Sequence, residues 1–345
     1  MRAERVLITG GAGFIGCHLA ARLIQLGKRV VILDNLSRPG AERNLQWLRE
    51  HHGHTLTFVH GDLRRETDVE EALVGAEVVY HLAAQTAVTR SLRDPRRDFE
   101  DNLLGTFNVL EAARRSPLRP IVIYASTNKV YGALANVAVV ELETRYAFAS
   151  CSQGIDERQP LDFHSPYGCS KGAADQYVRD YYRTYGLTTV VFRQSCIYGP
   201  RQMGVEDQGW VAWFVLAALT GQPITIYGDG KQVRDLLYID DLVEAYLLAV
   251  EHIEVTQGQV YNIGGGMQNT LSVWWELRPL LEELLEQRLA EPAFAPWRPG
   301  DQRIFVADTS KARREFGWAP RVPVREGLLR LVEWAREQAH TPAAV

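Results

Sequence analysis

A glycine-rich turn near the start of the chain restricts its fold more than any other feature. A short apolar run at 6–9 leads into Gly10-Gly11-Ala12-Gly13-Phe14-Ile15-Gly16, and an amphipathic run follows at 17–26. This order predicts a strand, a tight turn and a helix. Glycine lets the backbone approach a pyrophosphate closely, and the N-terminus of the helix stabilises its charge. The sequence therefore predicts the first unit of a dinucleotide-binding fold.

The second predicted strand, at 29–33, ends in an acidic residue that favours one dinucleotide. Asp34 lies 18 residues beyond Gly16, where a carboxylate accepts the hydroxyls of an adenosine ribose and repels a 2′-phosphate. NAD is therefore the expected cofactor in preference to NADP, although the cation Arg38 stands close by. A βα unit with glycine turns and no ligand is the alternative.

Strands and helices continue to alternate along the chain. Further strands are expected at 56–59, 78–84 and 121–125, and a helix at 100–114. This alternation indicates a Rossmann-type, doubly wound parallel α/β sheet, joined by a smaller mixed α/β domain. We expect an NAD-binding domain at 1–194 that returns at about 236–265, and a substrate domain at 195–235 and 266–340.

Most residues expected to contact NAD lie in the turns and strand ends of the first domain, because ligands bind beyond the carboxyl ends of such strands, and three lie on predicted helices. They are Gly10, Gly13, Phe14, Ile15, Gly16, Asp34, Asn35, Ser37, Arg38, Asp62, Leu63, Leu82, Ala83, Ala84, Asn102, Tyr167 and Lys171.

Composition argues against several other classes of protein. The net charge of −4 leaves no basic footprint for a nucleic acid. No uninterrupted apolar run approaches the ~18 residues of a membrane span. The four cysteines are scattered without metal-type spacing. We therefore expect a cytoplasmic protein with reduced thiols that binds no metal, nucleic acid or membrane.

Tyr167 and Lys171 form a candidate acid/base pair. Ser-Pro at 165–166 suits the start of a helix, on which Tyr167 and Lys171 stand one turn apart on one face. A tyrosine with a pKa of ~10 is a poor base at neutral pH. A nearby ammonium group lowers this pKa, so that the phenolate can accept the proton of a sugar or alcohol hydroxyl. The same spacing also arises by chance on exposed helices.

Several motifs, in the correct order, resemble the extended short-chain dehydrogenase/reductases that act on nucleotide sugars. They are Thr-Gly-Gly-Ala-Gly-Phe-Ile-Gly at 9–16, His-Leu-Ala-Ala at 81–84, Ser-Thr-x-x-Val-Tyr-Gly at 126–132, Tyr-Gly-x-Ser-Lys at 167–171 and Tyr-Gly-Pro at 198–200. The resemblance implies a catalytic triad of Thr127 (or Ser126 beside it), Tyr167 and Lys171. It also implies reversible hydride transfer between a sugar carbinol and a tightly held nicotinamide.

The two residues after Thr127 limit which of the family's reactions this chain can catalyse. Dehydratases of this family carry Asp-Glu there, whereas this chain carries Asn128-Lys129, which cannot supply that acid and base. The reactions that this chain could still catalyse are dehydrogenation, reduction and epimerisation.

The motifs are most similar to those of the CDP-paratose 2-epimerases, also called tyvelose epimerases. The similar segments include Ser-Thr-Asn-Lys-Val-Tyr-Gly at 126–132 and Gly-Val-Glu-Asp-Gln-Gly-Trp at 204–210. Cys196 stands where most of the superfamily has asparagine, and this substitution belongs to the tyvelose-type signature. The segment at 133–164 is longer than in simple 4-epimerases, and we expect that it could close over the sugar.

The resemblance also suggests which residues contact the substrate. Arg234 and Arg298 resemble the family's phosphate contacts, for which the planar fork of arginine is well suited. The full set of expected substrate residues is Gln85, Thr86, Asn128, Lys129, Gln194, Cys196, Gln208, Gly209, Tyr227, Arg234, Arg298 and Asp301.

The sequence thus predicts an NAD-dependent epimerase acting at C2 of a CDP-linked deoxyhexose. A UDP-glucose or UDP-glucuronate 4-epimerase with the same triad is the alternative, and a non-catalytic NAD-sensing protein is a remote one. We expect a homodimer or homotetramer, with the helices at 100–114 and 173–185 as a possible interface.

Overall fold

The computed structural model describes residues 4–53, 55–298 and 300–340 of the chain. Its larger half is built on one parallel sheet with the strand order β12-β8-β5-β4-β1-β2-β3. The strands are β1 (Arg5–Thr9), β2 (Arg29–Asp34), β3 (Leu56–His60), β4 (Val78–His81), β5 (Ile121–Thr127), β8 (Thr189–Gln194) and β12 (Val260–Ile263). The order runs outward from β1 in both directions, so the predicted doubly wound fold is confirmed.

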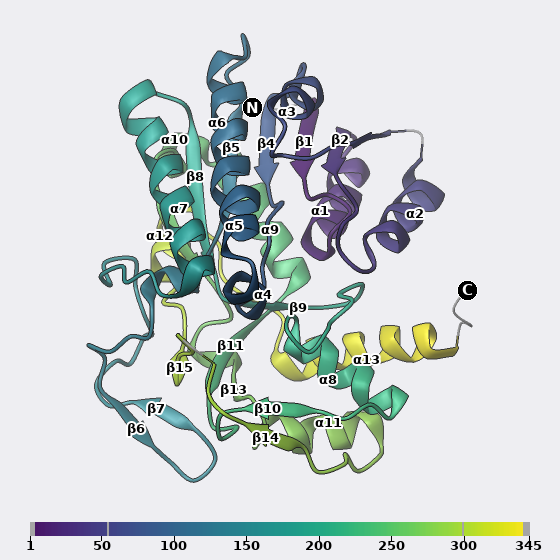
Figure 1. Ribbon diagram of the computed structural model, residues 1–345, viewed down its shortest axis with the longest axis vertical. Helices are drawn as coiled ribbons and strands as arrows, with labels where there is room; N and C mark the ends of the chain where they lie inside the picture. The colour runs from purple at the N-terminus through teal and green to yellow at the C-terminus, as the bar shows by residue number, and fades with distance from the viewer. Residues whose placement is uncertain (1–3, 54, 299, 341–345) are drawn as a thin grey trace.

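Helices cover both faces of this sheet (Figure 1). One face carries α1 (Phe14–Gln25), α2 (Ala41–His52) and α9 (Ile239–Glu251), and the other carries α3 (Glu66–Leu73), α6 (Gly105–Arg115) and α7 (Ser165–Tyr185). Val6 and Ile8 of β1 pack on the first face, whereas Leu7 packs on the second. Because successive strand residues point to opposite faces, a strand buried on both sides is apolar throughout.

The remaining elements of the larger half are short. They are α4 (Val88–Arg93), α5 (Pro95–Phe99), the π-helix η1 (Glu100–Leu104), the 3-10 turn η2 (Asn128–Tyr131) and α10 (Ile253–Thr256). The helix expected at 100–114 therefore begins with a π-helical turn.

The smaller half lies below the large sheet in Figure 1. Its central strand, β11 (Val233–Tyr238), pairs with β9 (Cys196–Tyr198), β13 (Thr270–Ser272) and β15 (Ile304–Phe305). The other elements of this half are β6 (Val139–Glu141), β7 (Tyr146–Phe148), α8 (Trp210–Thr220), β10 (Thr225–Tyr227), the 3-10 turn η3 (Met267–Asn269), α11 (Leu277–Leu285), β14 (Ala293–Ala295) and α13 (Val324–His340).

One helix within the range 266–340, expected to belong to the substrate domain, packs on the large sheet instead. The helix α12 (Ser310–Phe316) lies against the large sheet, because the ring of Phe316 contacts Phe192 of β8 and Tyr261 of β12 at centroid distances of 6.4 and 4.9 Å. Amphipathic periodicity shows that such a helix has an apolar face but does not show which sheet that face covers.

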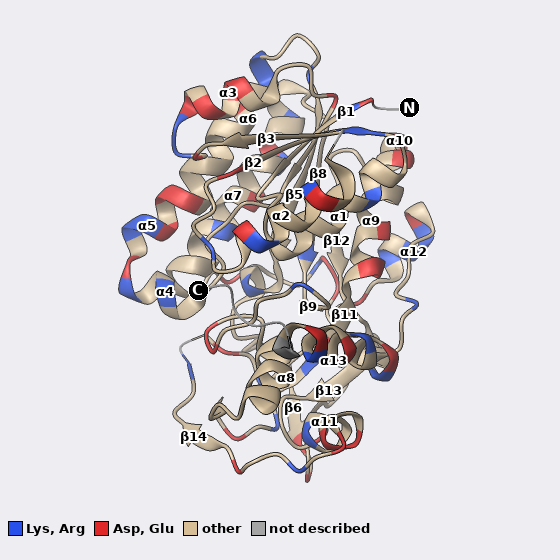
Figure 2. Cartoon of the chain, turned by 90° about the vertical axis from the view of Figure 1, so that its right-hand side faces the viewer, with Lys and Arg blue, Asp and Glu red and all other residues tan. Residues whose placement is uncertain are grey.

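Charged side chains of both signs are interspersed along α5 and α13, whereas α3 carries only acidic ones (Figure 2). Within the described residues, no helix is both long and apolar enough to cross a membrane.

A buried ion pair ties α7 to the sheet. Both oxygens of Asp175 accept from the guanidinium of Arg193 on β8, at 2.9 and 3.0 Å, and only 0% and 3% of these two side chains are exposed. Ser126 at the end of β5 also donates to Asp175, at 2.8 Å. Arg193 donates in turn to the hydroxyl of Tyr131 at 3.1 Å. This network fixes how α7 lies against β5 and β8.

The Asp175→Ala variant should lose about 3–5 kcal/mol of unfolding free energy, because it leaves the buried cation of Arg193 without its partner. Urea denaturation measures the loss. The exposed Asp180 on the same helix provides a matched control, and Asp180→Ala should change stability by no more than about 0.5 kcal/mol. Equal losses in the two variants would contradict the role given to the ion pair.

Candidate active site

A cavity of about 770 Å³ lies at the carboxyl ends of β1, β2, β4 and β5, and the segment 200–209 forms part of its wall. Every residue expected to contact NAD lines this cavity except Asn102. Asn102 lies behind the wall, where its Oδ1 accepts from the amide of Gln85 at 2.8 Å and its Nδ2 donates to Ser170 at 3.0 Å. Asn102 therefore stabilises a residue of the cavity wall, Gln85, and does not itself face the cavity.

The glycine turn forms a cradle that larger residues would fill. A Cβ at Gly10, whose φ is 70°, would lie 2.7 Å from the amide nitrogen of Ala83, and one at Gly16 would lie 2.3 Å from the carbonyl oxygen of Gly10. No side chain caps the N-terminus of α1 at Gly13. Close backbone approach and an uncapped helix N-terminus fit the pyrophosphate of a dinucleotide.

Asp34 is oriented by the backbone at the end of β2. Its two carboxylate oxygens accept from the amides of Ala12 at 3.0 Å and Leu36 at 2.8 Å. Burial raises its pKa, although these two hydrogen bonds oppose the shift. Asp62 sits beside it, where Arg64 lowers the pKa of its carboxyl and Asn35 donates to it at 3.2 Å.

The first turn of α7 brings the candidate base into the cavity. Ser165, with a φ of 69°, accepts from the amide of Gly168 at 3.2 Å, as expected of a capping residue. The amide of Tyr167 donates to Ser91 of α4 at 3.1 Å. Burial raises the pKa of Tyr167 to about 12, while a hydrogen bond with Thr127 and the positive charge of Arg38 act in the opposite direction. Thr127 and Tyr167 therefore meet, as predicted.

Lys171 lies one turn further on and is also buried. Its Nζ donates to the carbonyl oxygen of Ala125 at 2.6 Å and stands 4.2 Å from the ring centroid of Tyr124. Burial lowers the pKa of Lys171 to about 7, against the opposing charges of Asp175 and Asp98. Burial thus favours the neutral form of Lys171, and the two carboxylates favour its charged form.

Ser126, the other candidate hydroxyl, is turned toward the interior. Because its Oγ donates to Asp175, the geometry favours Thr127 as the hydroxyl that meets a substrate.

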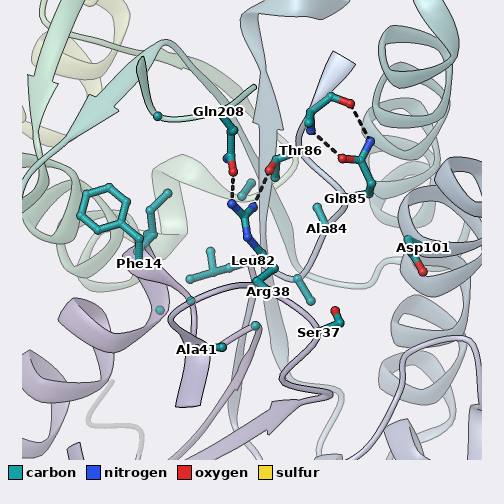
Figure 3. Close-up of a pocket in the computed structure, with 18 of the residues that line it drawn as sticks. Phe14, Ser37, Arg38, Ala41, Leu82, Ala84, Gln85, Thr86, Asp101 and Gln208 are labelled. Atoms are coloured by element: carbon teal, nitrogen blue, oxygen red, sulfur yellow. Dashed lines mark hydrogen bonds between the residues drawn. The ribbon is translucent and has the colours of Figure 1, made fainter. Parts of the chain in front are cut away.

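The expected substrate residues fall into two groups. Gln85, Thr86, Gln194, Cys196, Gln208 and Gly209 line the cavity, whereas Asn128, Lys129, Tyr227, Arg234, Arg298 and Asp301 lie outside its lining. In the first group, the side-chain amide of Gln85 exchanges two hydrogen bonds with the backbone of Ala87 (Figure 3). The thiol of Cys196 accepts from the indole nitrogen of Trp210 at 3.1 Å. Burial raises the pKa of the Cys196 thiol to about 12, so it remains a neutral packing group.

The second group forms a cluster with an excess of positive charge. One oxygen of Asp301 accepts from Lys129 and Arg234, both at 3.0 Å. Burial alone would raise the pKa of Asp301, but these two cations lower it to about 2. Arg298 stacks over the ring of Tyr227 at 3.9 Å from its centroid. Lys129 and Arg234 share the carboxylate of Asp301, and Arg298 pairs with Asp207 at 3.7 Å, which leaves a net positive charge that suits the binding of an anion.

The segment at 133–164, expected to close over the sugar, contributes nothing to the cavity lining. Its hairpin of β6 and β7 lies at the far end of the smaller half (Figure 1), where Tyr146 donates to Asp229 at 2.6 Å.

Sequence reasoning missed several functional-site residues. Arg90 and Arg93 of α4 and Arg201 of the 200–209 segment line the cavity. Asp98 is fully buried and accepts from Gln85 at 2.8 Å and from Ser170 at 2.5 Å. The spacing of Arg90 and Arg93 after a strand end was an available signal. Asp98 lies in a strongly charged run that looks solvent-exposed in the sequence.

The family described as NAD dependent epimerase/dehydratase matches residues 6–264. The chain belongs to this family. NAD is therefore its cofactor, and its substrates are sugar nucleotides. Among the residues that the structure describes, no group of three histidine, cysteine or acidic side chains could hold a metal ion.

Individual relatives cover nearly the whole chain. It is 44% identical over 339 residues to the CDP-paratose 2-epimerase of Salmonella typhi, which covers 96% of this chain and 98% of that one. It is 35% identical to the UDP-glucose 4-epimerase of Mycolicibacterium smegmatis, with 97% and 99% covered. The crystal structure of UDP-glucuronic acid 4-epimerase from Bacillus cereus, in complex with UDP-glucuronic acid and NAD, matches with a TM-score of 0.84 and 29% identity, covering 97% and 99%.

Gly16→Ala should abolish the retention of NAD, because the added Cβ would lie 2.3 Å from the carbonyl oxygen of Gly10. The dinucleotide released from the purified, heat-denatured protein measures retention. Gly27→Asn is the matched control at the other end of α1. Nothing lies within 4 Å of a Cβ there, and asparagine tolerates the φ of 78°. Full NAD content in Gly16→Ala would show that the cradle does not hold the cofactor.

Proposed function

We propose that this protein is an NAD-dependent nucleotide-sugar epimerase that inverts C2 of a CDP-linked hexose, converting CDP-paratose to CDP-tyvelose or acting on a related CDP-hexose. The observation that carries the proposal is the meeting of Thr127, Tyr167 and Lys171 in the cavity that the NAD residues line. The 44% identity to a CDP-paratose 2-epimerase supports the choice of nucleotide and carbon.

In the proposed mechanism, Tyr167 moves the proton and Thr127 orients the sugar. The phenolate of Tyr167 accepts the proton of the C2 hydroxyl, to which the hydroxyl of Thr127 is hydrogen-bonded. When bound, NAD⁺ takes up the hydride from C2 and returns it. The 2-keto sugar would have to turn its other face toward the nicotinamide before the hydride returns to C2, which inverts this carbon, and Tyr167 gives the proton back to the oxygen. Lys171 supplies positive charge that stabilises the phenolate and holds the nicotinamide ribose.

Asn128 and Lys129 support epimerisation over elimination of water. Asn128 is engaged with Gln302 at 3.3 Å and Lys129 with Asp301 at 3.0 Å. Elimination needs an acid and a base next to Thr127, and neither of these side chains provides a carboxyl group.

A UDP-hexose or UDP-hexuronate 4-epimerase is the second candidate, favoured by the names of the relatives from M. smegmatis and B. cereus. It would use the same three residues on C4. The intact Thr127, Tyr167 and Lys171 argue against a non-catalytic NAD-sensing role.

The deciding experiment follows the ring protons of candidate sugars by NMR. Purified protein is incubated with CDP-paratose, CDP-glucose, UDP-glucose and UDP-glucuronate, without added cofactor. We expect inversion at C2 of a CDP sugar, and we expect Tyr167→Phe to lose at least about 100-fold in rate while it keeps its NAD. Inversion at C4 of a UDP sugar would overturn the substrate assignment, and a fully active Tyr167→Phe would overturn the mechanism.

We further propose that the protein is a cytoplasmic homo-oligomer. The four cysteines form no disulfide. The rings of Phe107 on α6 and Tyr177 on α7 lie edge to face at 6.1 Å and are 40% and 44% exposed, which suits a contact with a second copy of the chain.

Phe107→Glu should therefore convert the oligomer to a smaller species in size-exclusion chromatography with light scattering, because it places a charge in the apolar contact. Phe294→Glu on β14 is the control, since Phe294 is 52% exposed but lies in the other half of the molecule. A monomeric wild-type protein would refute the proposal.

A further inference from the structure

A closed ring of hydrogen bonds lies directly behind the cavity, around the carboxylate of Asp98. Its Oδ1 accepts from the side-chain amide of Gln85 at 2.8 Å and from that of Asn102 at 3.1 Å, and its Oδ2 accepts from the hydroxyl of Ser170 at 2.5 Å. Asn102 closes the ring, because it also donates to Ser170 at 3.0 Å and accepts from the backbone amide of Gln85 at 2.8 Å. None of the four side chains is more than 8% exposed.

The carboxylate of Asp98 holds its neighbours in place because it is buried among neutral groups. The three hydrogen bonds that the described residues provide to it all come from uncharged side chains. Burial raises its pKa, and the hydrogen bonds from Ser170 and Gln85 oppose this shift. A buried carboxylate is costly unless its hydrogen bonds are made, so the three donors are fixed where they lie. A buried polar network that is fully satisfied makes its surroundings rigid.

The ring joins two segments that meet at the cavity. Gln85 follows β4 and lines the cavity, whereas Ser170 lies on α7 between Tyr167 and Lys171. One side-chain N–H of Gln85 is used on Asp98 and the other on the carbonyl oxygen of Ala87 (Figure 3). A glutamine has only two such donors, so neither is free for a substrate. Gln85 therefore shapes the wall of the cavity and does not donate into it.

A second contact attaches the same two segments to each other. The hydroxyl of Ser91 on α4 accepts from the backbone amide of Tyr167 at 3.1 Å and donates to the carbonyl oxygen of Val88 at 2.7 Å. The first turn of α7 is thus joined to the segment 85–91 on both sides of Tyr167. Where this tyrosine stands relative to the wall at 85–87 is set from behind the cavity.

We propose that Asp98 is a positioning residue of the catalytic centre, which fixes Tyr167 against the wall at 85–87 through the hydrogen-bond ring. Asp98 does not line the cavity, so it acts through Ser170 and Gln85. A displacement of about 1 Å at a reaction centre costs on the order of 100-fold in rate, which is what the ring prevents. This inference rests on the proposed function, because it assumes that Tyr167 is the base.

The test compares Asp98→Leu with the conservative Asp98→Asn. Leucine has a similar shape but accepts no hydrogen bond, so three buried donors lose their acceptor. We expect kcat to fall roughly 10- to 100-fold, while KM for the sugar and the NAD content stay within about twofold. Asparagine keeps one oxygen for Gln85 and Asn102, and its amide donates to Ser170, whose hydroxyl turns to the carbonyl oxygen of Tyr167 at 3.2 Å. Asp98→Asn should therefore recover most of kcat.

Two further variants complete the comparison. Ser170→Ala leaves the charge of Asp98 in place but cuts the ring at α7, so it should lower kcat in the same way, and it serves as the test if Asp98→Leu does not fold. Asp180→Leu is the matched control, because Asp180 lies on the exposed face of α7 and accepts only from Thr184, at 3.2 Å, among the described residues. It should match the wild type.

A second readout does not depend on turnover. Hydrogen exchange followed by mass spectrometry reports how firmly the backbone is held in the peptides that cover 85–91 and 165–172. Exchange in these two peptides should be faster in Asp98→Leu and Ser170→Ala, and should keep the wild-type rate in Asp98→Asn and Asp180→Leu.

Four results would overturn the inference. An Asp98→Asn enzyme as impaired as Asp98→Leu would show that negative charge matters and the ring does not. A raised KM with an unchanged kcat would assign Asp98 to substrate binding. Loss of NAD, or faster exchange throughout the chain, would show a role in folding alone. Wild-type exchange in Ser170→Ala would show that the ring holds nothing. Failure of the wild type to turn over any CDP or UDP sugar would instead refute the proposed function, and hydrogen exchange would still test the ring.

Discussion

The site depends on one buried electrostatic contact, the ion pair of Asp175 and Arg193. It joins the middle of α7 to β8, and through Ser126 it reaches the end of β5. The two elements that carry these residues, β5 with Thr127 and α7 with Tyr167 and Lys171, are therefore aligned through a buried ion pair. Because a buried pair tolerates few geometries, it fixes the register of the helix on the sheet more tightly than apolar packing alone would.

Burial works against both partners of the acid/base pair. It raises the pKa of Tyr167 and lowers that of Lys171, so it disfavours the phenolate and the ammonium that the proposed mechanism uses. The protein counters this with fixed groups around the two residues. Asp98 and Asp175 favour the charged lysine, and Thr127 and Arg38 favour the phenolate. The same low-dielectric surroundings that make ionisation costly also strengthen each of these interactions.

The sheet, the cofactor turn and the gathering of Thr127, Tyr167 and Lys171 in one cavity could be predicted from the sequence because their signals are local. Apolar runs, glycine spacing and a tyrosine and lysine one turn apart each lie within a few residues. The errors and omissions depend on long-range contacts. Which sheet α12 covers is decided by Phe192 and Tyr261, and where Ser126 points is decided by Asp175. The hydrogen bond from Arg38 to Gln208 joins residues that are 170 positions apart. No pattern within one segment contains that information.

The position of the 200–209 segment beside the cavity has a consequence for metabolism. The 200–209 segment closes down on the loop between β2 and α2, where Met203 packs over Gly40 and Asn44 donates to the carbonyl oxygen of Arg201. A dinucleotide in this cavity would be flanked by both halves of the molecule, because the lining comes from the large sheet and from the 200–209 segment. An epimerisation that returns its hydride to the same dinucleotide consumes no oxidant. Its flux would then be independent of the ratio of oxidised to reduced NAD in the cell.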